Sequence, residues 1–141
     1  MLTRRGFAGF ASCAICAVAG FVATDTSAAE SASPAVTPGV TRKILSQMDG
    51  PMAGYVTIIV EAEIEAGVTV ARHTHPGIES GYVLEGEFDF PMQGQPTRRL
   101  KVGDSFQVPP ETPHAGAKVE QKVRITSTYV VEKGKPLASP A

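Results

Sequence analysis

The chain has 141 residues and a formal net charge of −1 at pH 7, with 13 Lys and Arg residues against 14 Asp and Glu residues. This balance, without a basic patch, excludes nucleic acid as an expected partner. Removal of the N-terminal signal described next leaves about 112 residues, which is enough for one domain with a single core.

Residues 1–29 are predicted to be a signal peptide of the twin-arginine type. Arg4-Arg5 precede an uncharged, mildly apolar run at 7–23, which falls short of the roughly 18–20 strongly apolar residues of a spanning helix. The arginine pair and Phe7 resemble the twin-arginine motif, although Ala8-Gly9 stand where that motif has Leu and Lys. An ordinary secretory signal that carries two arginines is the alternative. Either signal predicts a periplasmic or exported protein with no stable membrane anchor after cleavage.

Residues 30–48 are predicted to be a linker followed by a docking segment. The stretch from 30 to 38 is rich in Ser, Ala, Pro and Thr, a composition that buries little. The stretch from 41 to 48 fits either a short strand or a turn of helix, and Asp49-Gly50-Pro51 ends it.

Residues 49–132 are predicted to form one all-β domain, a sandwich or a barrel. Apolar and polar residues alternate with a period of two from Tyr55 onward, and turn signals recur roughly every eight to twelve residues. Gly86 is expected to turn a hairpin between strands at 80–84 and 87–92. Further strands are expected at 55–64, 68–75, 97–102, 105–108, 115–119 and 122–132. Residues 133–141 are expected to be a tail that is flexible or docked on a sheet edge.

Three histidines and one glutamate suggest a metal site. His73 and His75 lie two residues apart, so on a strand their side chains point to the same face. Pro76-Gly77 is a turn signal that can bring Glu79 back toward them, and His114 follows later between prolines. The H-x-H pattern recurs by chance, so the wider spacing has to decide between a site and ordinary surface histidines.

The wider spacing resembles the cupin superfamily. The first cupin motif, G-x5-H-x-H-x3-E-x6-G, is filled at every defined position, by Gly67, His73, His75, Glu79 and Gly86. The second motif, G-x5-P-x-G-x2-H-x3-N, is matched by Gly103, Pro109 and His114. Glu111 replaces its usual Gly and Lys118 its usual Asn, and neither position holds metal in the family.

The resemblance covers about residues 55–131 and is nearest to single-domain bacterial cupins of the type-2 class. It implies a single jelly-roll cupin barrel, with His73, His75, Glu79 and His114 as metal ligands near one mouth. Because cupins of this size often pair their edge strands, a homodimer is one expected state, and the sequence leaves the oligomeric state and the edge used open.

Imidazole with carboxylate suits a divalent metal ion, with Fe or Mn favoured and Ni, Co or Zn as alternatives. The twin-arginine route carries folded proteins, so this protein can take up its metal in the cytoplasm before export. In an open compartment the site would bind Cu or Zn more tightly than Fe or Mn. Structural zinc favours thiolates, but Cys13 and Cys16 both lie in the signal, so the site is expected to be functional. Four protein ligands on an octahedral ion leave two positions open for a small-molecule ligand or substrate.

Several side chains are candidates to line the cavity, although packing in the core is the alternative for each: Tyr82, Phe88, Phe90, Met92, Gln107 and Tyr129. Of these, Gln107 and Tyr82 are the expected hydrogen-bond donors toward the metal. No general base is evident, so three functions remain: an Fe- or Mn-dependent dioxygenase-type oxidoreductase on a small organic substrate, a non-catalytic small-ligand or metal-binding module, and a metal-dependent lyase or isomerase.

Overall fold

The computed structural model describes residues 37–141, so the predicted signal peptide and most of the linker lie outside the described residues. Residues 37–141 contain no helix with the length and apolarity that a membrane span requires. The regular structure of this part of the chain consists of ten strands: β1 (Val40–Asp49), β2 (Tyr55–Ile64), β3 (Val70–Thr74), β4 (Gly77–Glu85), β5 (Glu87–Phe90), β6 (Arg98–Lys101), β7 (Ser105–Val108), β8 (His114–Gly116), β9 (Val123–Glu132) and β10 (Ser139–Pro140). The all-β prediction is confirmed.

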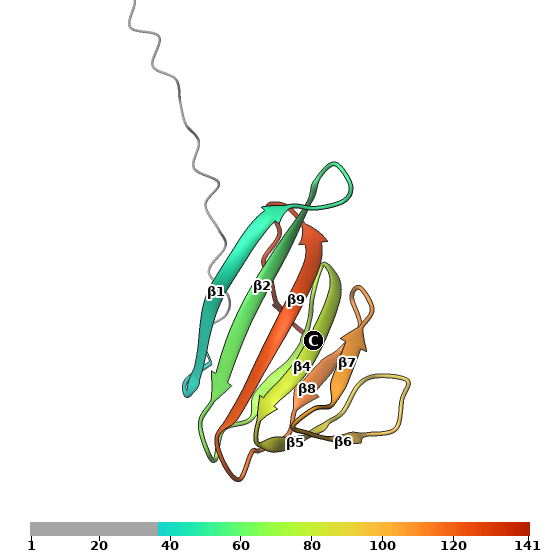
Figure 1. Ribbon diagram of the computed structural model, residues 1–141. Helices are drawn as coiled ribbons and strands as arrows, with labels where there is room; N and C mark the ends of the chain where they lie inside the picture. The colour runs from blue at the N-terminus through green and yellow to red at the C-terminus, as the bar shows by residue number, and fades with distance from the viewer. Residues whose placement is uncertain (1–36) are drawn as a thin grey trace, which may run out of the picture.

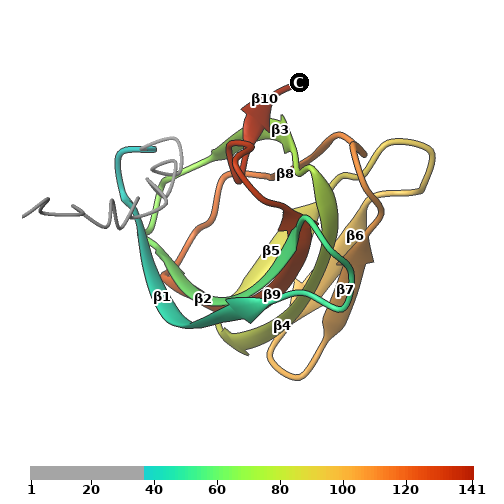
Figure 2. The ribbon, with the colours of Figure 1, turned by 90° about the horizontal axis from the view of Figure 1, so that it is seen from above.

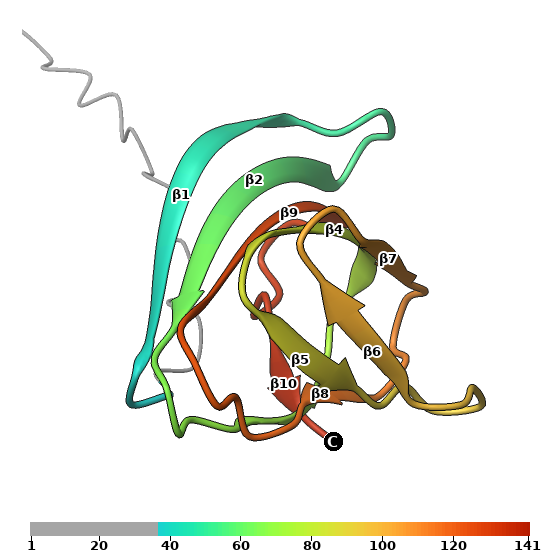
Figure 3. The same cartoon turned by 60° about the horizontal axis from the view of Figure 1, so that its bottom comes forward.

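The strands form two walls that face each other. One wall is a strongly curved antiparallel sheet with the order β1-β2-β9-β4-β7 (Figures 1 and 3). Across from it lies the sheet β10-β3-β8 (Figure 2). Backbone hydrogen bonds from Ala115 to Pro91 (3.1 Å) and from Ala117 to Asp89 (2.9 Å) join β8 to the chain at β5, which pairs with β6. The second wall therefore runs β10-β3-β8-β5-β6, and the two walls enclose a barrel.

Residues 41–48, for which strand and helix were both open, belong to strand β1. This strand pairs with β2 along its length, with an irregularity between Ile44 and Ser46, and forms the edge of the large sheet. Its side chains at Val40 and Arg42 are half-buried, whereas those beyond them are exposed.

The predicted hairpin around Gly86 is wrong. Gly86 does have the expected positive φ of 75°, but β4 pairs with β7 and β9, and β5 pairs with β6. The glycine turns the chain from one wall to the other, because β4 already has a neighbour on each side.

The tail is docked on a sheet edge, one of its two expected states. Strand β10 pairs with β3, through Ser139 with Thr74 and Pro140 with His73. The C-terminal residues thereby close the second wall beside the histidines.

Alternation of buried and partly buried residues along β9 shows how the core is built. Every second residue from Val123 to Val131 points inward, including Ser127 and Tyr129. The buried apolar residues fall into two clusters, one around Phe88, Phe90, Phe106 and Leu100 and the other around Val56, Ile58 and Tyr129. Polar side chains at the inward positions 127 and 129 therefore interrupt an otherwise apolar interior.

Candidate metal centre

The three histidines lie together inside the barrel. His73 on β3 is the cross-strand partner of His114 on β8, and His75 follows in the segment that crosses from β3 to β4. The ring centroids are separated by 4.3 Å between His73 and His114, 4.9 Å between His73 and His75, and 5.0 Å between His75 and His114. One nitrogen from each ring lies within 4.8 Å of the others, so the cluster can hold one metal ion.

Each imidazole is held from behind by a backbone carbonyl. The Nδ1 atoms lie 2.7 Å from Ala71 O for His73, 2.5 Å from Leu137 O for His75 and 2.9 Å from Thr112 O for His114. A carbonyl oxygen can only accept, so each Nδ1 carries a proton and donates it. In the neutral ring, Nε2 then presents its lone pair, which is the form that binds metal.

Glu79 lies against two of these nitrogens. Its Oε2 is 3.1 Å from Nε2 of His75 and 3.3 Å from Nε2 of His114, and the residue is 5% exposed. His75 Nε2 is buried and has no partner with hydrogen-bond geometry. The buried lone pair of His75 Nε2 thus faces a carboxylate oxygen, an arrangement that a bound cation stabilises. The donor set therefore fits a divalent metal ion.

The electrostatics favour neutral His73 and ionised Glu79, the forms of these two groups that bind a cation. Burial lowers the pKa of His73 to about 4, helped by the neighbouring His114 and His75 and opposed by the Ala71 carbonyl and Glu79. His73 is therefore neutral at pH 7. Burial alone raises the pKa of Glu79, but hydrogen bonds and positive charge from His114 and His75, when these are protonated, outweigh it and hold that pKa well below its usual range. A metal ion in the same place acts in the same direction.

The other oxygen of Glu79 accepts two hydrogen bonds from strand β9. Ser127 Oγ donates at 2.8 Å and Tyr129 Oη at 2.9 Å, both to Oε1. Tyr129 is the cross-strand partner of Glu79, and Ser127 is the partner of Gly81, so the sheet register places both hydroxyls beside the carboxylate. Burial, then the charge of Glu79, raises the pKa of Tyr129 well above its ordinary value, so its hydroxyl stays protonated and donates.

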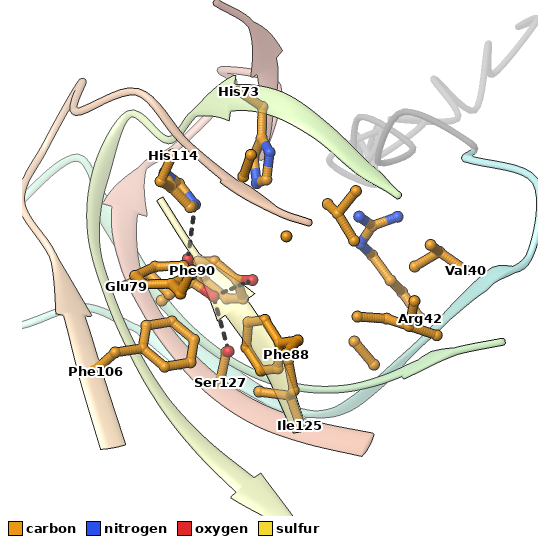
Figure 4. A pocket seen from close by; sticks show the side chains of 16 residues that line it. Val40, Arg42, His73, Glu79, Phe88, Phe90, Phe106, His114, Ile125 and Ser127 are labelled. Atoms are coloured by element: carbon orange, nitrogen blue, oxygen red, sulfur yellow. Dashed lines mark hydrogen bonds and ion pairs between the residues drawn. The ribbon is translucent and has the colours of Figure 1, made fainter. Parts of the chain in front are cut away.

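The cluster borders a cavity of about 520 Å³, which includes its open mouth. His73, His114 and Glu79 lie to one side of it, and Val40 and Arg42 from β1 lie to the other (Figure 4). Most of the remaining wall is apolar: Ala62, Ile64, Val70, Phe88, Phe90, Phe106, Ala115 and Ile125. An apolar cavity with a few convergent polar groups is typical of a small-molecule site.

The predicted lining residues are right in part. Phe88, Phe90 and Tyr129 line the cavity, whereas Met92 is buried in the core. Tyr82 and Gln107, the expected donors toward the metal, do not line it: Tyr82 is 45% exposed, and Gln107 is exposed and donates to Ser80. Both occupy the outward positions of their strands.

Sequence reasoning missed Ser127 and Arg42. Ser127 could have been found from the alternation of β9, because it occupies an inward position between Ile125 and Tyr129. No comparable signal was available for Arg42, because its segment could not be assigned to a strand.

Glu111 adopts the left-handed conformation that the second motif usually gives to glycine, with φ of 55°. Its backbone N–H donates to the carbonyl of His75 at 2.9 Å. The turn is therefore kept despite the substitution, and it ties the His114 loop to the segment that carries His75.

Residues 60–132, about half of the chain, match the Cupin_2 family of cupin domains, and the chain belongs to this family. The jelly-roll cupin fold implied by the motifs is thereby confirmed.

Three known proteins illustrate the similarity. Dimethylsulfoniopropionate lyase DddQ from Ruegeria pomeroyi is 38% identical over 66 residues, which cover 47% of this chain and 33% of that protein. The chain thus spans about a third of the length of this curated relative. The crystal structure of DddQ matches with a TM-score of 0.60 and 21% identity over 77% of this chain and 57% of that one, which shows the fold alone.

KdgF from Halomonas sp. matches with a TM-score of 0.56 and 27% identity over 70% of this chain and 85% of that one. Salicylate 1,2-dioxygenase from Pseudoaminobacter salicylatoxidans, in a gentisate adduct, matches with a TM-score of 0.56 and 22% identity, covering 68% of this chain and 26% of that one. The dioxygenase likeness is again one of fold.

Proposed function

We propose that this protein is a metal-dependent cupin enzyme that acts on a small organic molecule, with His73, His75, His114 and Glu79 as the ligands of its metal ion. The observation that carries the proposal is the convergence of the histidine nitrogens and a carboxylate oxygen at the wall of an apolar cavity. A purely structural site is usually closed and rich in cysteine, whereas this one is open to a cavity and has no thiol.

A bound divalent ion, with Fe or Mn favoured, supplies Lewis acidity or electron transfer at this position. The protein itself orients the ligands of the ion and limits water around the substrate. Backbone carbonyls orient the three rings, and Glu79 contributes a negative charge that two hydroxyls hold in one orientation. The phenyl rings of the wall limit water around the substrate.

Lyase chemistry is the reaction class with the more specific support. DddQ is 38% identical to this chain over 66 residues, which is a similarity of sequence and not of fold alone. The aligned residues cover a third of DddQ. In such a reaction a bound ion would polarise the substrate as a Lewis acid, and a base has to accept the proton that the elimination releases. Tyr129 and Ser127 are the protic groups nearest to the carboxylate ligand.

Dioxygenase-type oxidation is the second candidate. It is supported by a ligand set that suits Fe or Mn and by the positions that four ligands leave open on an octahedral ion. Salicylate 1,2-dioxygenase shares the fold.

The test begins with elemental analysis of the protein, beside a His114→Ala variant, after reconstitution with Fe(II), Mn(II) or Zn(II). We expect close to one ion per chain in the wild type and loss of the ion in the variant, because removal of one ligand leaves the others poorly compensated. Full metal occupancy in the variant would contradict the ligand assignment.

Turnover is then measured on dimethylsulfoniopropionate and on a panel of small aliphatic and aromatic acids. Consumption of the substrate is followed by proton NMR, and O₂ uptake is recorded in parallel. Turnover without O₂ uptake supports the lyase, and stoichiometric O₂ uptake supports the dioxygenase. A fully loaded protein that turns over nothing in the panel would favour a non-catalytic binding module instead. Tyr82→Phe is the matched control, because its hydroxyl lies outside the cavity.

We also propose export by the twin-arginine route, which rests on Arg4-Arg5 and the weakly apolar run after them. Replacement of both arginines by lysine is expected to leave the precursor in the cytoplasm, as measured by fractionation. Unchanged export would indicate the general secretory route.

A further inference from the structure

The four proposed ligands of the metal centre are not held alike. His75, His114 and Glu79 are buried, with 3%, 2% and 5% of their surfaces exposed. His73 is only half-buried. Oε2 of Glu79 contacts Nε2 of both buried histidines, whereas within residues 37–141 no ion pair joins Glu79 to His73. Figure 4 shows the contact between Glu79 and His114, with His73 apart from it. Polar contacts therefore join three of the four groups, and His73 is outside this set.

The backbone near His75 and Glu79 is hydrogen-bonded on more than one side. The carbonyl of His75 accepts from the N–H of Glu111 at 2.9 Å. The carbonyl of the next residue, Pro76, accepts from the N–H of Glu132 at 3.1 Å. Glu79 lies on β4, which pairs with β9 on one side and with β7 on the other. These bonds fix both ligands relative to the large sheet.

The backbone on both sides of His114 is fixed in a similar way. The carbonyl of Pro113 accepts from the N–H of Gln93 at 2.9 Å. The N–H of Ala115 donates to the carbonyl of Pro91 at 3.1 Å. His114 is therefore anchored to the segment that follows β5, in addition to its pairing with β3.

Strand β3, which carries His73, has fewer such bonds. Its pairing with β8 is limited to Val70 and His73, with an irregularity between them. Its pairing with β10 is limited to His73 and Thr74. The ring of His73 is held by the carbonyl of Ala71 on the same strand, so it moves with that strand. Because short and interrupted pairing lowers the free energy that a local displacement requires, His73 is the ligand that can leave with the smallest loss of structure.

The three remaining groups can hold an ion without His73. Two histidines and one carboxylate form the ligand set that binds Fe(II) in many oxygenases, and this set leaves several positions open. His73 lines the cavity, as do His114 and Glu79. Departure of His73 would therefore free the side of the site that borders the cavity.

We infer that His73 is the exchangeable ligand of this centre, and that a substrate with two neighbouring oxygen donors takes its place on the ion. The inference rests on the proposed function for the four ligands, and it adds which of them gives way and what class of molecule replaces it. Zinc rarely has more than five ligands, so a molecule that binds it through two atoms requires one of four protein ligands to leave. The contacts described above assign that role to His73.

The first test follows the histidine rings by ¹⁵N NMR in the untagged, zinc-loaded protein. The chain contains three histidines, all of them in this cluster, so the single alanine variants can assign every imidazole signal. Acetohydroxamate, which binds zinc through two oxygens, is added to saturation as judged by calorimetry. We expect Nε2 of His73 to return to its metal-free shift, while Nε2 of His75 and of His114 keep their zinc-bound shifts.

Azide is the matched control, because it binds through one atom and zinc can accommodate a fifth ligand. It should leave all three histidines bound to zinc. Release of His75 or His114 by acetohydroxamate would overturn the inference. Retention of all three rings, or no detectable binding of acetohydroxamate, would overturn it as well.

The second test compares zinc affinities by competition with a chromophoric chelator. His73→Ala is expected to weaken zinc binding about tenfold and His75→Ala more than about 100-fold, since only the second change disrupts the set of three. His73→Gln, which retains most of the side-chain volume, should resemble His73→Ala. Arg72→Ala is the control for strand β3, because this exposed side chain bonds to Gln93, and it should bind zinc like the wild type. Equal losses in His73→Ala and His75→Ala would contradict an exchangeable His73.

The two proposals can fail separately. If His114→Ala keeps its zinc, the proposed metal centre itself is wrong. If His73→Ala loses zinc to the same extent as His75→Ala and His114→Ala, the metal centre is supported and only the exchange of His73 fails.

Discussion

Each imidazole of the centre has its Nδ1 hydrogen-bonded to a backbone carbonyl, and this decides which nitrogen is available to a metal. The same reasoning applies to Glu79, whose Oε1 is occupied by Ser127 and Tyr129 and whose Oε2 faces the histidines. Since two donors hold Oε1, the carboxylate presents one defined oxygen to an ion. At the scale of single residues, the site is therefore a set of acceptor atoms, each oriented by a hydrogen bond on the side of its group that faces away from the ion.

Tyr129→Phe tests this orientation. The change removes the hydroxyl that donates to Glu79 Oε1 at 2.9 Å and leaves the ring in place. We expect metal affinity to fall about tenfold, as is typical when a partner of a ligating carboxylate is lost. Competition with a chromophoric chelator measures the affinity. Tyr82→Phe is the control and should match the wild type, because its hydroxyl lies outside the cavity. An unchanged affinity in Tyr129→Phe would show that Ser127 alone orients the carboxylate.

Gly81 controls the wall of the cavity. It is the cross-strand partner of Phe106, and a Cβ at position 81 would lie 2.1 Å from Cζ of that ring. Gly81→Ala is therefore expected to push the ring aside and to destabilise the fold by about 1–3 kcal/mol. Thermal unfolding followed by circular dichroism measures the loss. Adding Phe106→Leu to the variant should recover part of it by making room for the methyl group, and a melting temperature equal to that of the wild type would contradict the clash.

At the scale of elements, the site depends on a contact between the C-terminal segment and a strand more than 60 residues earlier in the chain. The tail places β10 beside β3 and offers the carbonyl of Leu137 to His75. Leu137 also packs against the buried cluster of Val56, Ile58 and Tyr129. The last residues therefore act as a support for the histidine strand.

Two truncations test this support. A chain that ends at Pro136 loses both β10 and the Leu137 carbonyl, whereas a chain that ends at Ala138 loses only β10. We expect metal affinity to fall about 10–100-fold in the shorter chain, because His75 loses the partner that fixes its ring. The longer chain should lose much less. Chelator competition on both proteins measures the difference, and equal affinities would mean that the Leu137 carbonyl does not orient the ring.

At the scale of the whole molecule, the centre joins the two walls of the barrel. The histidines belong to β3, β8 and the crossing segment, whereas Glu79 lies on β4 of the large sheet. An ion held by all four groups would link the walls and relieve the mutual repulsion of the acceptors. Metal binding and folding stability are therefore expected to be coupled.

Metal removal tests this coupling. Treatment with a chelator should lower the midpoint of thermal unfolding, and metal restored at about 100 times its dissociation constant should return about 2.7 kcal/mol. Calorimetry measures both states. His114→Ala should show little dependence on metal. An unfolding midpoint of the wild type that is the same with and without metal would argue against an ion between the walls.

Much of the fold and of the centre could be predicted from the sequence. Strand periodicity is a local property, so 55–64 and 105–108 were predicted with the bounds that the structure has. The spacing of His73 and His75 with Glu79 was also sufficient to bring these residues together. Which strands pair is not local, however, and the hairpin around Gly86 was predicted wrongly for that reason.

The sequence by itself determined the all-β class and the four residues of the metal-site hypothesis, because alternation along a strand and the spacing of ligand types are properties of neighbouring residues. Only the tertiary structure decided what surrounds them. Ser127 and Tyr129 reach Glu79 across 48 and 50 residues of chain, and the Leu137 carbonyl reaches His75 across 62. Arg42 faces the cavity because β1 pairs with β2 in one register. Such contacts arise from long-range pairing, which a single sequence does not encode in any local pattern.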